Sequence, residues 1–374
     1  MVMLRTMLGA TTALVVGTLT AQAGGIDRSG QGLGALFETG RYIELSFGSV
    51  TPEITGNDVA AFGGGATGDV GGDYTQFALS YKYDINERLS FALNLDQPFG
   101  ADVLYGPASL ALGGTTADAT SLQLSGILRY KLNDRFSIHG GVRATQSEGF
   151  IRLQGLAYGG LNNYNVTLGT DVAPGYLVGV AYEIPDIALR VALTYHSEVK
   201  HDFLTTERIG AAQIAPQSVT DVTLPQSVNL DFQSGIAKDT LLFGQIRWAD
   251  WSAFRVDPTA FVGLAGGGLI DLEDSVTYSL GVGRRFNETW AGSVSVSYEA
   301  TGTDNLVSPL APTDGRIGVT VGGVYTHENM KVSFGVNYTQ LGDAQPETGT
   351  PDVARASMSG NSAVGVGVKV GWAF

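Results

Sequence analysis

The strongest constraint on this chain is the strict alternation of apolar with small or polar side chains in its last stretch, 361–374. One set of alternate positions carries Val364, Val366, Val368, Val370, Trp372 and Phe374. The positions between them carry Ala363, Gly365, Gly367, Lys369 and Gly371. Because successive side chains of a β-strand point to opposite faces, this stretch has one apolar face and one small or polar face. A strand that separates lipid from a polar lumen has this pattern.

Similar stretches recur along the chain, separated alternately by short polar turns and by longer loops rich in Gly or Asp. The fourteen predicted strands are 40–50, 73–84, 87–97, 119–132, 135–147, 173–184, 187–199, 223–237, 240–251, 275–286, 289–300, 313–326, 329–341 and 361–374. An even strand count is typical of a single-chain bacterial barrel. The sequence therefore predicts an all-β fold, a 14-stranded antiparallel transmembrane β-barrel with a short N-terminal plug segment.

The N-terminus has the features of an export signal. Arg5 precedes an apolar run from Met7 to Leu19, and Ala21-Gln22-Ala23 supplies the small residues that signal peptidase accepts. The run is shorter than the roughly 20 residues that a spanning helix needs, which disfavours an uncleaved anchor. We therefore predict a signal peptide at 1–23, a short hatch or plug at 24–39 and the barrel at 40–374. Strands that cross lipid must close into a barrel to satisfy their backbone hydrogen bonds.

Composition excludes several other classes. Asp and Glu number 36 against 22 Lys and Arg, so no basic surface for nucleic acid is expected. The chain has no cysteine, which removes disulfides and thiolate chemistry. Only 16% of residues are charged, against roughly 25% in a typical soluble domain. The alternative of a secreted β-sandwich or β-helix predicts polar outer faces, which these strands lack.

Nothing in the sequence points to catalysis. The chain has four histidines, His139, His196, His201 and His327, and none accompanies a recognisable serine motif. The acids Asp69, Asp73, Asp271, Glu273 and Asp274 fit no twelve-residue calcium loop. We therefore predict a protein that is not an enzyme and that has no catalytic residue, no metal site and no cofactor.

The predicted lumen is rich in charge. The inward basic positions are Lys82, Arg129, Lys131, Arg143, Arg190, Arg247, Arg285, Arg316, Lys331 and Lys369. The inward acids are Glu44, Asp96, Glu183 and Asp231. One interpretation is a path that favours anionic or carboxylate-bearing solutes. The other is that these charges pair across the barrel and fill it with a hydrogen-bonded network.

Three segments resemble the FadL/TodX family of outer-membrane transporters of hydrophobic substrates. They are Leu224-Pro225-Gln226-Ser227-Val228-Asn229-Leu230, the stretch from Phe243 through Trp248-Ala249-Asp250-Trp251-Ser252, and Pro312-Thr313-Asp314-Gly315-Arg316 with Gly322-Gly323 and Tyr325. Their order and the strand count extend the resemblance over nearly the whole mature chain. The resemblance implies uptake of long-chain fatty acids or similar hydrophobic compounds, which pass from outer loops into the barrel and leave sideways into the membrane.

The resemblance also implies candidate site residues. Members have a kinked third strand that opens the wall, and here that strand ends in Gln97-Pro98-Phe99-Gly100, so Pro98 and Gly100 are the candidates for a lateral opening. The docking groove of the family corresponds to loops near 148–172 and 200–222. Its candidate substrate contacts are Phe150, Leu153, Leu156, Phe203 and Leu204, with Arg143 and Arg190 to hold a carboxylate. A plain strand end and packing between the loops are the competing explanations.

The plug departs from the family pattern. Members carry Asn-Pro-Ala before the first strand, whereas this chain has Leu36-Phe37-Glu38-Thr39-Gly40, with Leu36 and Phe37 as the plug residues. A general or anion-preferring porin therefore remains an alternative, and an adhesin or structural barrel is a third. We expect a monomeric protein of the Gram-negative outer membrane, in contact with lipids and lipopolysaccharide. Phe374 would be the signal for the barrel-assembly machinery.

Overall fold

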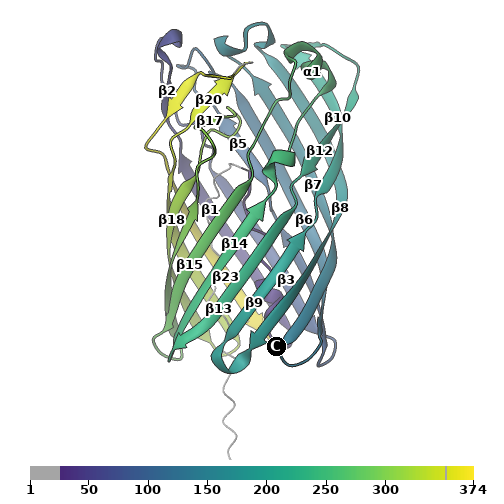
Figure 1. Cartoon of the computed structure of the whole chain (residues 1–374), viewed down its shortest axis with the longest axis vertical. Coiled ribbons are helices and arrows are strands. Elements are labelled where there is room, and N and C mark those ends of the chain that lie inside the picture. The colour runs from purple at the N-terminus through teal and green to yellow at the C-terminus, as the bar shows by residue number, and fades with distance from the viewer. Residues whose placement is uncertain (1–25, 350–351) are drawn as a thin grey trace, which may run out of the picture.

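The computed structural model describes residues 26–349 and 352–374, so the predicted signal peptide lies outside the described residues. Fourteen antiparallel strands form one closed wall (Figure 1), and the last strand pairs with the first from Tyr42↔Ala373 to Glu53↔Ser362. The wall strands are β1 (Tyr42–Glu53), β3 (Tyr74–Asp84), β4 (Leu89–Asp96), β6 (Thr116–Lys131), β7 (Phe136–Leu153), β8 (Tyr164–Ile184), β9 (Leu189–His196), β13 (Ser227–Ala237), β14 (Thr240–Ala249), β15 (Ser275–Arg285), β16 (Trp290–Glu299), β18 (Arg316–His327), β19 (Met330–Leu341) and β23 (Ser362–Ala373). The predicted fold and strand count are confirmed.

Alternation along the strands divides the wall into two faces. On β23, Val364, Val366 and Val368 are exposed on the outer face. On β19, Asn337 and Thr339 are buried on the inner face. Leucine, valine and aromatic side chains on the outside match the lipid-facing band of an outer-membrane barrel.

Short turns join the strands at the end of the barrel that also holds the C-terminus (Figure 1). Three of these turns share one local structure. Asn86, Asn133 and Asn287 each accept, through Oδ1, hydrogen bonds from the backbone amides two and three residues later, at 2.8–2.9 Å. Asparagine is favoured in turns because its side chain can bond the backbone in this way. These turns are the short connections that the sequence predicts.

At the opposite end the structure corrects the predicted loops. The loop expected at 148–172 is mostly strand, because β7 and β8 stay paired up to Leu153↔Tyr164. The loop expected at 200–222 is a hairpin of β10 (Val199–Ile209), β11 (Ala212–Gln213) and β12 (Ser218–Leu224). The alternation continues past the membrane-spanning part: Ile151, Leu153 and Val166 point inward and are buried. Strands β7 and β8 therefore keep their alternation of inward and outward side chains beyond the lipid, where they form a hairpin.

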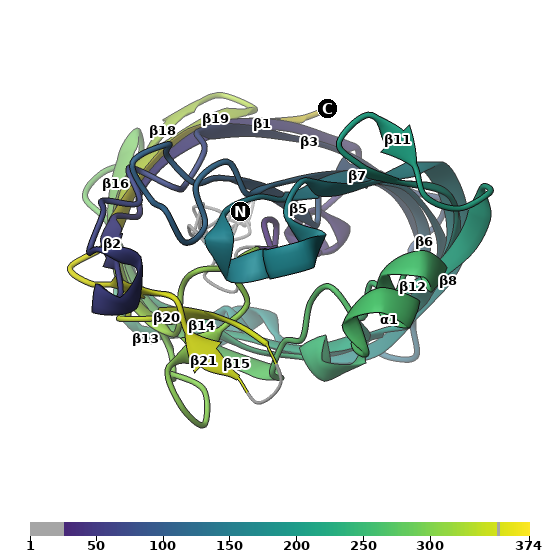
Figure 2. The same ribbon diagram turned by 90° about the horizontal axis from the view of Figure 1, so that it is seen from above.

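Short elements close the outer mouth between these hairpins, as the view from above shows (Figure 2). They are β2 (Gly56–Asp58), η2 (Ala60–Phe62), η3 (Leu156–Leu161), η5 (Trp251–Ala253), α1 (Thr259–Ala265), β17 (Leu306–Val307), β20 (Gln345–Thr348), β21 (Val353–Ala354) and β22 (Ala356–Met358). The short strand β5 (Gly100–Leu104) belongs to the barrel sheet and pairs with β6. Glu207 of β10 holds α1 in place, because its carboxylate accepts the Ala260 and Phe261 amides at 2.9 and 2.7 Å. A carboxylate at a helix N-terminus satisfies amides that have no partner within the helix.

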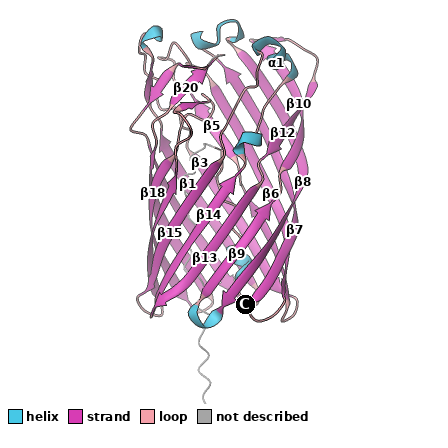
Figure 3. Ribbon diagram, in the orientation of Figure 1, coloured by secondary structure: helices cyan, strands magenta, loops and turns pink. Residues whose placement is uncertain are grey.

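Helices are few (Figure 3). Besides those of the mouth, η4 (Pro185–Ile187) lies in a short turn, and η1 (Gly34–Phe37) belongs to the N-terminal segment inside the barrel. Within the described residues, none of the helices has the length and apolar character needed to cross a membrane.

Candidate functional site

The wall is interrupted beside its third strand. Pairing between β3 and β4 ends at Leu79↔Leu95, and the next backbone hydrogen bond across this edge runs from the Gly72 amide to the Asp102 carbonyl, at 3.0 Å. Between these points the five residues Tyr74–Ala78 pair only with β1. At about 3.3 Å per residue the interruption is roughly 17 Å long. We call it the wall window.

The sequence from Asp96 to Gly100 explains the window. Pro98 has no amide hydrogen to donate, so the ladder cannot continue through it. The chain bends at this point and resumes as β5, which pairs with β6 from Gly100↔Thr120 onward. On the opposite edge, the Phe77 amide donates to Gln97 Oε1 at 3.0 Å. A side-chain bond therefore replaces part of the missing ladder.

The N-terminal segment fills the window from the lumen. The Arg28 amide donates to the Pro98 carbonyl at 2.7 Å, and the Gly100 amide donates to the Ile26 carbonyl at 2.8 Å. Ser29 Oγ donates to the Asp96 carboxylate at 2.7 Å. Residues 26–28 therefore act as a short antiparallel strand against the bend, and they satisfy backbone groups that the break would leave without partners.

A buried ion pair fixes the same segment to the far wall. Arg247 Nε lies 2.7 Å from Asp27 Oδ2, and both side chains are almost completely buried. Arg247 Nη1 also donates to Ser227 Oγ and Asn229 Oδ1, at 3.0 and 2.9 Å. Asn229 Nδ2 in turn donates to the Gly30 carbonyl at 2.9 Å. We call this group of Asp27, Arg247, Ser227 and Asn229 the latch.

A second anchor holds the hatch lower in the lumen. Leu36 is fully buried in a cluster with Leu33, Ala92, Ile127 and Leu177. The Phe37 ring lies between two guanidinium groups, with Arg129 Cζ at 4.6 Å and Arg190 Cζ at 4.5 Å from its centroid. Cations over an aromatic face are attracted by its quadrupole.

The hatch leaves cavities in the lumen. The upper cavity, of about 290 Å³, borders the inner side of the wall window and is lined there by Arg28, Gln76, Phe77, Asp96 and Gln97. A second cavity, of about 630 Å³, lies at the end of the short turns. The window, the hatch and the upper cavity therefore form one continuous candidate site.

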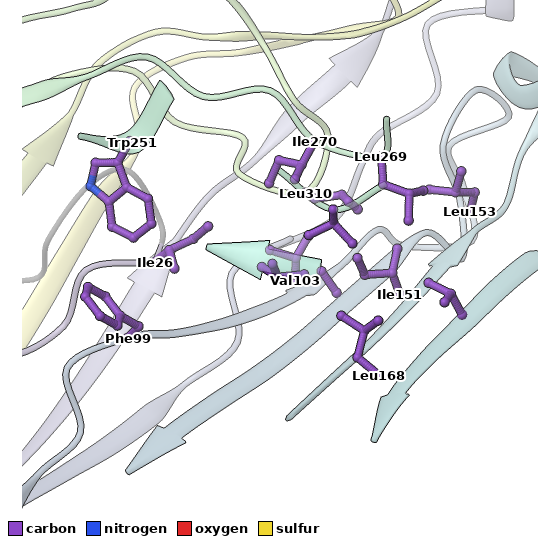
Figure 4. Packing of buried hydrophobic residues seen from close by; sticks show 14 of the residues in the cluster. Ile26, Phe99, Val103, Ile151, Leu153, Leu168, Trp251, Leu269, Ile270 and Leu310 are labelled. Atoms are coloured by element: carbon purple, nitrogen blue, oxygen red, sulfur yellow. The ribbon is translucent and has the colours of Figure 1, made fainter. Parts of the chain in front are cut away.

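Above the hatch, the mouth elements bury a large apolar cluster, which we call the outer cluster. Its buried members include Ile26, Phe99, Val103, Leu153, Phe203, Trp251 and Phe261. The Phe99 and Trp251 rings meet edge to face with centroids 5.6 Å apart, and Ile26 lies beside them (Figure 4). The outer cluster therefore reaches from the outer surface down to the hatch.

The predicted apolar contacts divide into two sets. Leu153 and Phe203 lie in the outer cluster, and Phe150 is half-buried beneath Arg152. Leu156 and Leu204 point outward and are 63% and 57% exposed. The structure therefore brings only Leu153 and Phe203 together. Sequence reasoning missed Ile26 and Phe99 as their partners, because their packing depends on contacts between distant segments.

The two predicted arginines lie in different surroundings. Arg143 is buried in the wall, where it donates to Gln123 Oε1 at 3.2 Å and to the Ser197 carbonyl, and it does not line the upper cavity. Arg190 lines both cavities, but it is held by the Phe37 ring and by Gln233 Oε1 at 3.0 Å. Both guanidinium groups therefore have protein partners.

Most lumen cations pair with acids. The pairs are Lys82–Asp84, Arg129–Glu183, Arg247–Asp27, Arg316–Glu299 and Lys369–Glu44. Lys131 and Arg285 lie at the turn end and are exposed, rather than inside as predicted. This favours the interpretation of a hydrogen-bonded filling over that of an open anion path. Among the described residues, no group of three or more metal-ligating side chains is placed to hold an ion.

A second break in pairing, between β8 and β10, is bridged by side chains. His201 Nδ1 lies 2.8 Å from the Asp171 carboxylate, and the Tyr176 amide donates to Ser197 Oγ at 3.0 Å. The Ser197 amide donates back to the Tyr176 carbonyl at 2.9 Å. This break is closed by the wall itself, unlike the window, which the hatch fills.

Comparisons with known proteins agree with this geometry. A family model described as outer membrane protein transport protein (OMPP1/FadL/TodX) matches residues 35–374. No curated protein sequence matches the chain. Among solved structures, a Pseudomonas aeruginosa FadL homologue has a TM-score of 0.70 at 14% identity, covering 91% of this chain and 92% of that one. The P. putida toluene transporter TodX has a TM-score of 0.65 at 15% identity, covering 90% and 91%. The Ralstonia pickettii toluene transporter TbuX has a TM-score of 0.62 at 14% identity, covering 91% and 90%. At these identities the structures show a shared fold.

Proposed function

Because the chain belongs to the OMPP1/FadL/TodX family of outer-membrane transport proteins, we propose that it carries hydrophobic small molecules across the Gram-negative outer membrane by diffusion. Long-chain fatty acids and monoaromatic hydrocarbons are the candidate substrates. The solved structures with the same fold include toluene transporters, which supports the second class. The proposal needs neither a cofactor nor an energy source.

The proposed path begins in the outer cluster. Leu156 and Leu204 would provide the first apolar contacts on the outer surface, and Phe150 would follow. Leu153 and Phe203 would then take the molecule toward Ile26, Phe99 and Trp251. Transfer of apolar surface from water into such a cluster is favourable by about 25 cal/mol per Å².

Lateral release through the wall window is the second part of the proposal. The observation that carries it is the position of the window, which borders the upper cavity on one side and the lipid face on the other. A hydrophobic molecule gains nothing by leaving into water at the short-turn end. Pro98 keeps the ladder open, and Gly100 lets the hatch pack against the bend.

The porin alternative is disfavoured by the outer cluster and the latch. A water-filled porin needs a continuous polar channel, whereas here apolar side chains fill the mouth and a buried ion pair holds the hatch across the lumen. We further propose that the protein acts as a monomer in lipid and lipopolysaccharide, assembled through its C-terminal Phe374.

A cross-link across the window tests this function. The chain has no cysteine, so Phe77→Cys with Gln97→Cys can be joined by a short bifunctional reagent without side reactions. We expect uptake of fatty acid and toluene into cells that depend on this protein to fall to background when the link closes. Tyr81→Cys with Leu93→Cys, a directly paired position below the window, is the matched control and should transport normally.

Planar-bilayer conductance of the same protein separates the alternatives. Steady conductance with no hydrophobic uptake would establish the porin and overturn the proposal. Normal uptake with the window linked would remove lateral release but keep transport.

A further inference from the structure

The side chain of Arg28 spans the wall window from edge to edge. Its Cζ lies 4.1 Å from the centroid of the Tyr74 ring on β3. On the other edge it packs on Gly100, where an added Cβ would lie only 2.6 Å from the Arg28 Cζ. The guanidinium therefore lies between β3 and the bend, where the ladder is missing.

This guanidinium is short of partners. None of its nitrogens donates a hydrogen bond to a residue that the structure describes, and its Nε is buried. Asp102 and Asp118 lie close enough to interact with it electrostatically. An arginine with five donors and no acceptor is an unusual choice for a half-buried position that needs only to be filled.

The surroundings explain why the cation is stable there without a ligand. Asp102 and Asp118 are direct cross-strand partners on β5 and β6, and both are exposed on the outer face. Like charges placed opposite each other are destabilising, so a nearby cation relieves them. On the inner side, Arg28 lines the upper cavity. Arg28 therefore has counter-charges on the outer side of the window and borders the upper cavity on the inner side.

We propose that Arg28 selects ligands by their head group at the wall window, its guanidinium binding the carboxylate of an aliphatic acid that reaches the upper cavity. Aliphatic carboxylates then occupy the window region in preference to uncharged molecules of the same chain length. The inference rests on the proposed transport of hydrophobic compounds. It adds that the wall window prefers aliphatic carboxylates. A fork of parallel N–H donors fits a carboxylate better than any uncharged head group.

Calorimetric titration of the detergent-solubilised full-length protein tests the idea with octanoate and octan-1-ol, which share one chain length. Arg28→Gln should weaken octanoate binding about tenfold or more and change octan-1-ol binding less than about twofold, because only the charged head group loses its partner. Arg28→Lys should fall between the two, since it keeps the charge and loses the fork.

Two glycines provide a test that keeps the charge. Gly100→Ala places a Cβ against the guanidinium and should displace it, so octanoate binding should weaken as in Arg28→Gln. Gly126→Ala is the matched control on β6, because its new Cβ would meet nothing closer than 3.9 Å. Arg190→Gln removes the other arginine of the same cavity and should leave the preference for octanoate intact.

The outcomes distinguish a failure of the proposed transport function from a failure of head-group selection by Arg28. If the wild-type protein binds neither compound, the proposed function fails and the inference fails with it. If it binds both and the Arg28 variants keep the wild-type ratio of affinities, only the inference is overturned. Equal weakening of both ligands would mean that Arg28 merely holds the hatch, and an equal effect of Arg190→Gln would mean that the lumen charge as a whole is responsible.

Discussion

Arg247 ties the hatch to the far wall of the barrel through its ion pair with Asp27. Removing one partner of a buried ion pair leaves an uncompensated charge and costs roughly 3–5 kcal/mol. Arg247→Ala should therefore release residues 26–30 from the latch and raise ionic conductance in planar bilayers severalfold. Lys200→Ala, which removes an exposed pair with Glu198, is the control and should conduct like the wild type. Unchanged conductance in Arg247→Ala would show that the lower anchor at Phe37 holds the hatch unaided.

We expect Glu347 to make the stability of the outer mouth depend on pH. Burial, with Asp352 and other nearby acids, raises the pKa of Glu347 to about 7. Because folding raises the pKa of this carboxyl group, the folded mouth favours its protonated form. The contribution of Glu347 to the stability of the mouth is therefore present below the ordinary pKa of glutamate and is lost as the pH rises toward 7. Amide exchange in β20 and β21, corrected for intrinsic rates, should be slower at about pH 5.5 than at about pH 8. Glu347→Gln should abolish the difference, and a persistent difference would assign it to another group.

At the residue scale the sequence predicted most of the side chains that face inward, with Lys131 and Arg285 as exceptions, but not their partners. The alternation puts Arg247 inside, yet nothing in the sequence pairs it with Asp27, 220 positions away. The resemblance drew attention to Ser227, Asn229 and Trp251 without showing what they do. Their contacts with the hatch exist only after the barrel closes.

The short turns are the elements on which strand register depends. Asn133→Ala removes two side-chain bonds to the backbone and should lower the free energy of unfolding by about 1 kcal/mol. Urea unfolding of protein folded into lipid vesicles would measure this loss. Asp134→Ala changes the next residue of the same turn and should have little effect, because its carboxylate bonds to no described residue. Similar losses in both variants would show that the side-chain bonds of Asn133 are not the cause.

The boundaries of strands could be predicted within the lipid-facing part of the barrel. They could not be predicted at the outer mouth, where no lipid contacts the strands. All fourteen strands and their short turns follow from alternation, because the membrane requires one apolar face. The family resemblance predicts loops at 148–172 and 200–222, where the structure has the outer ends of β7 and β8 and the strands β10, β11 and β12. Pairing between neighbouring hairpins, which a single sequence does not reveal, decides that they are strands.

Closure of the barrel depends on the seam between β1 and β23. Phe374 ends this seam, where its amide donates to the Arg41 carbonyl at 3.0 Å and its ring is exposed on the outer face. Deletion of Phe374 should reduce the fraction of folded barrel in the outer membrane severalfold, as read from the heat-dependent shift in gel mobility. Phe374→Trp keeps an aromatic ring and should assemble normally. Normal assembly of the deletion would place the assembly signal elsewhere in β23.

The short strand at residues 26–28 has a consequence for the cell that carries this barrel. The same three residues fill the window, reach the latch and touch the outer cluster. Under the proposed lateral release, opening the window would therefore also loosen the segment that blocks the lumen. Each hydrophobic molecule that leaves sideways would briefly loosen the osmotic barrier of the envelope. Uptake of hydrophobic compounds and permeability to other solutes would then depend on the same short segment. A higher rate of uptake would expose the cell to more of the toxic solutes around it.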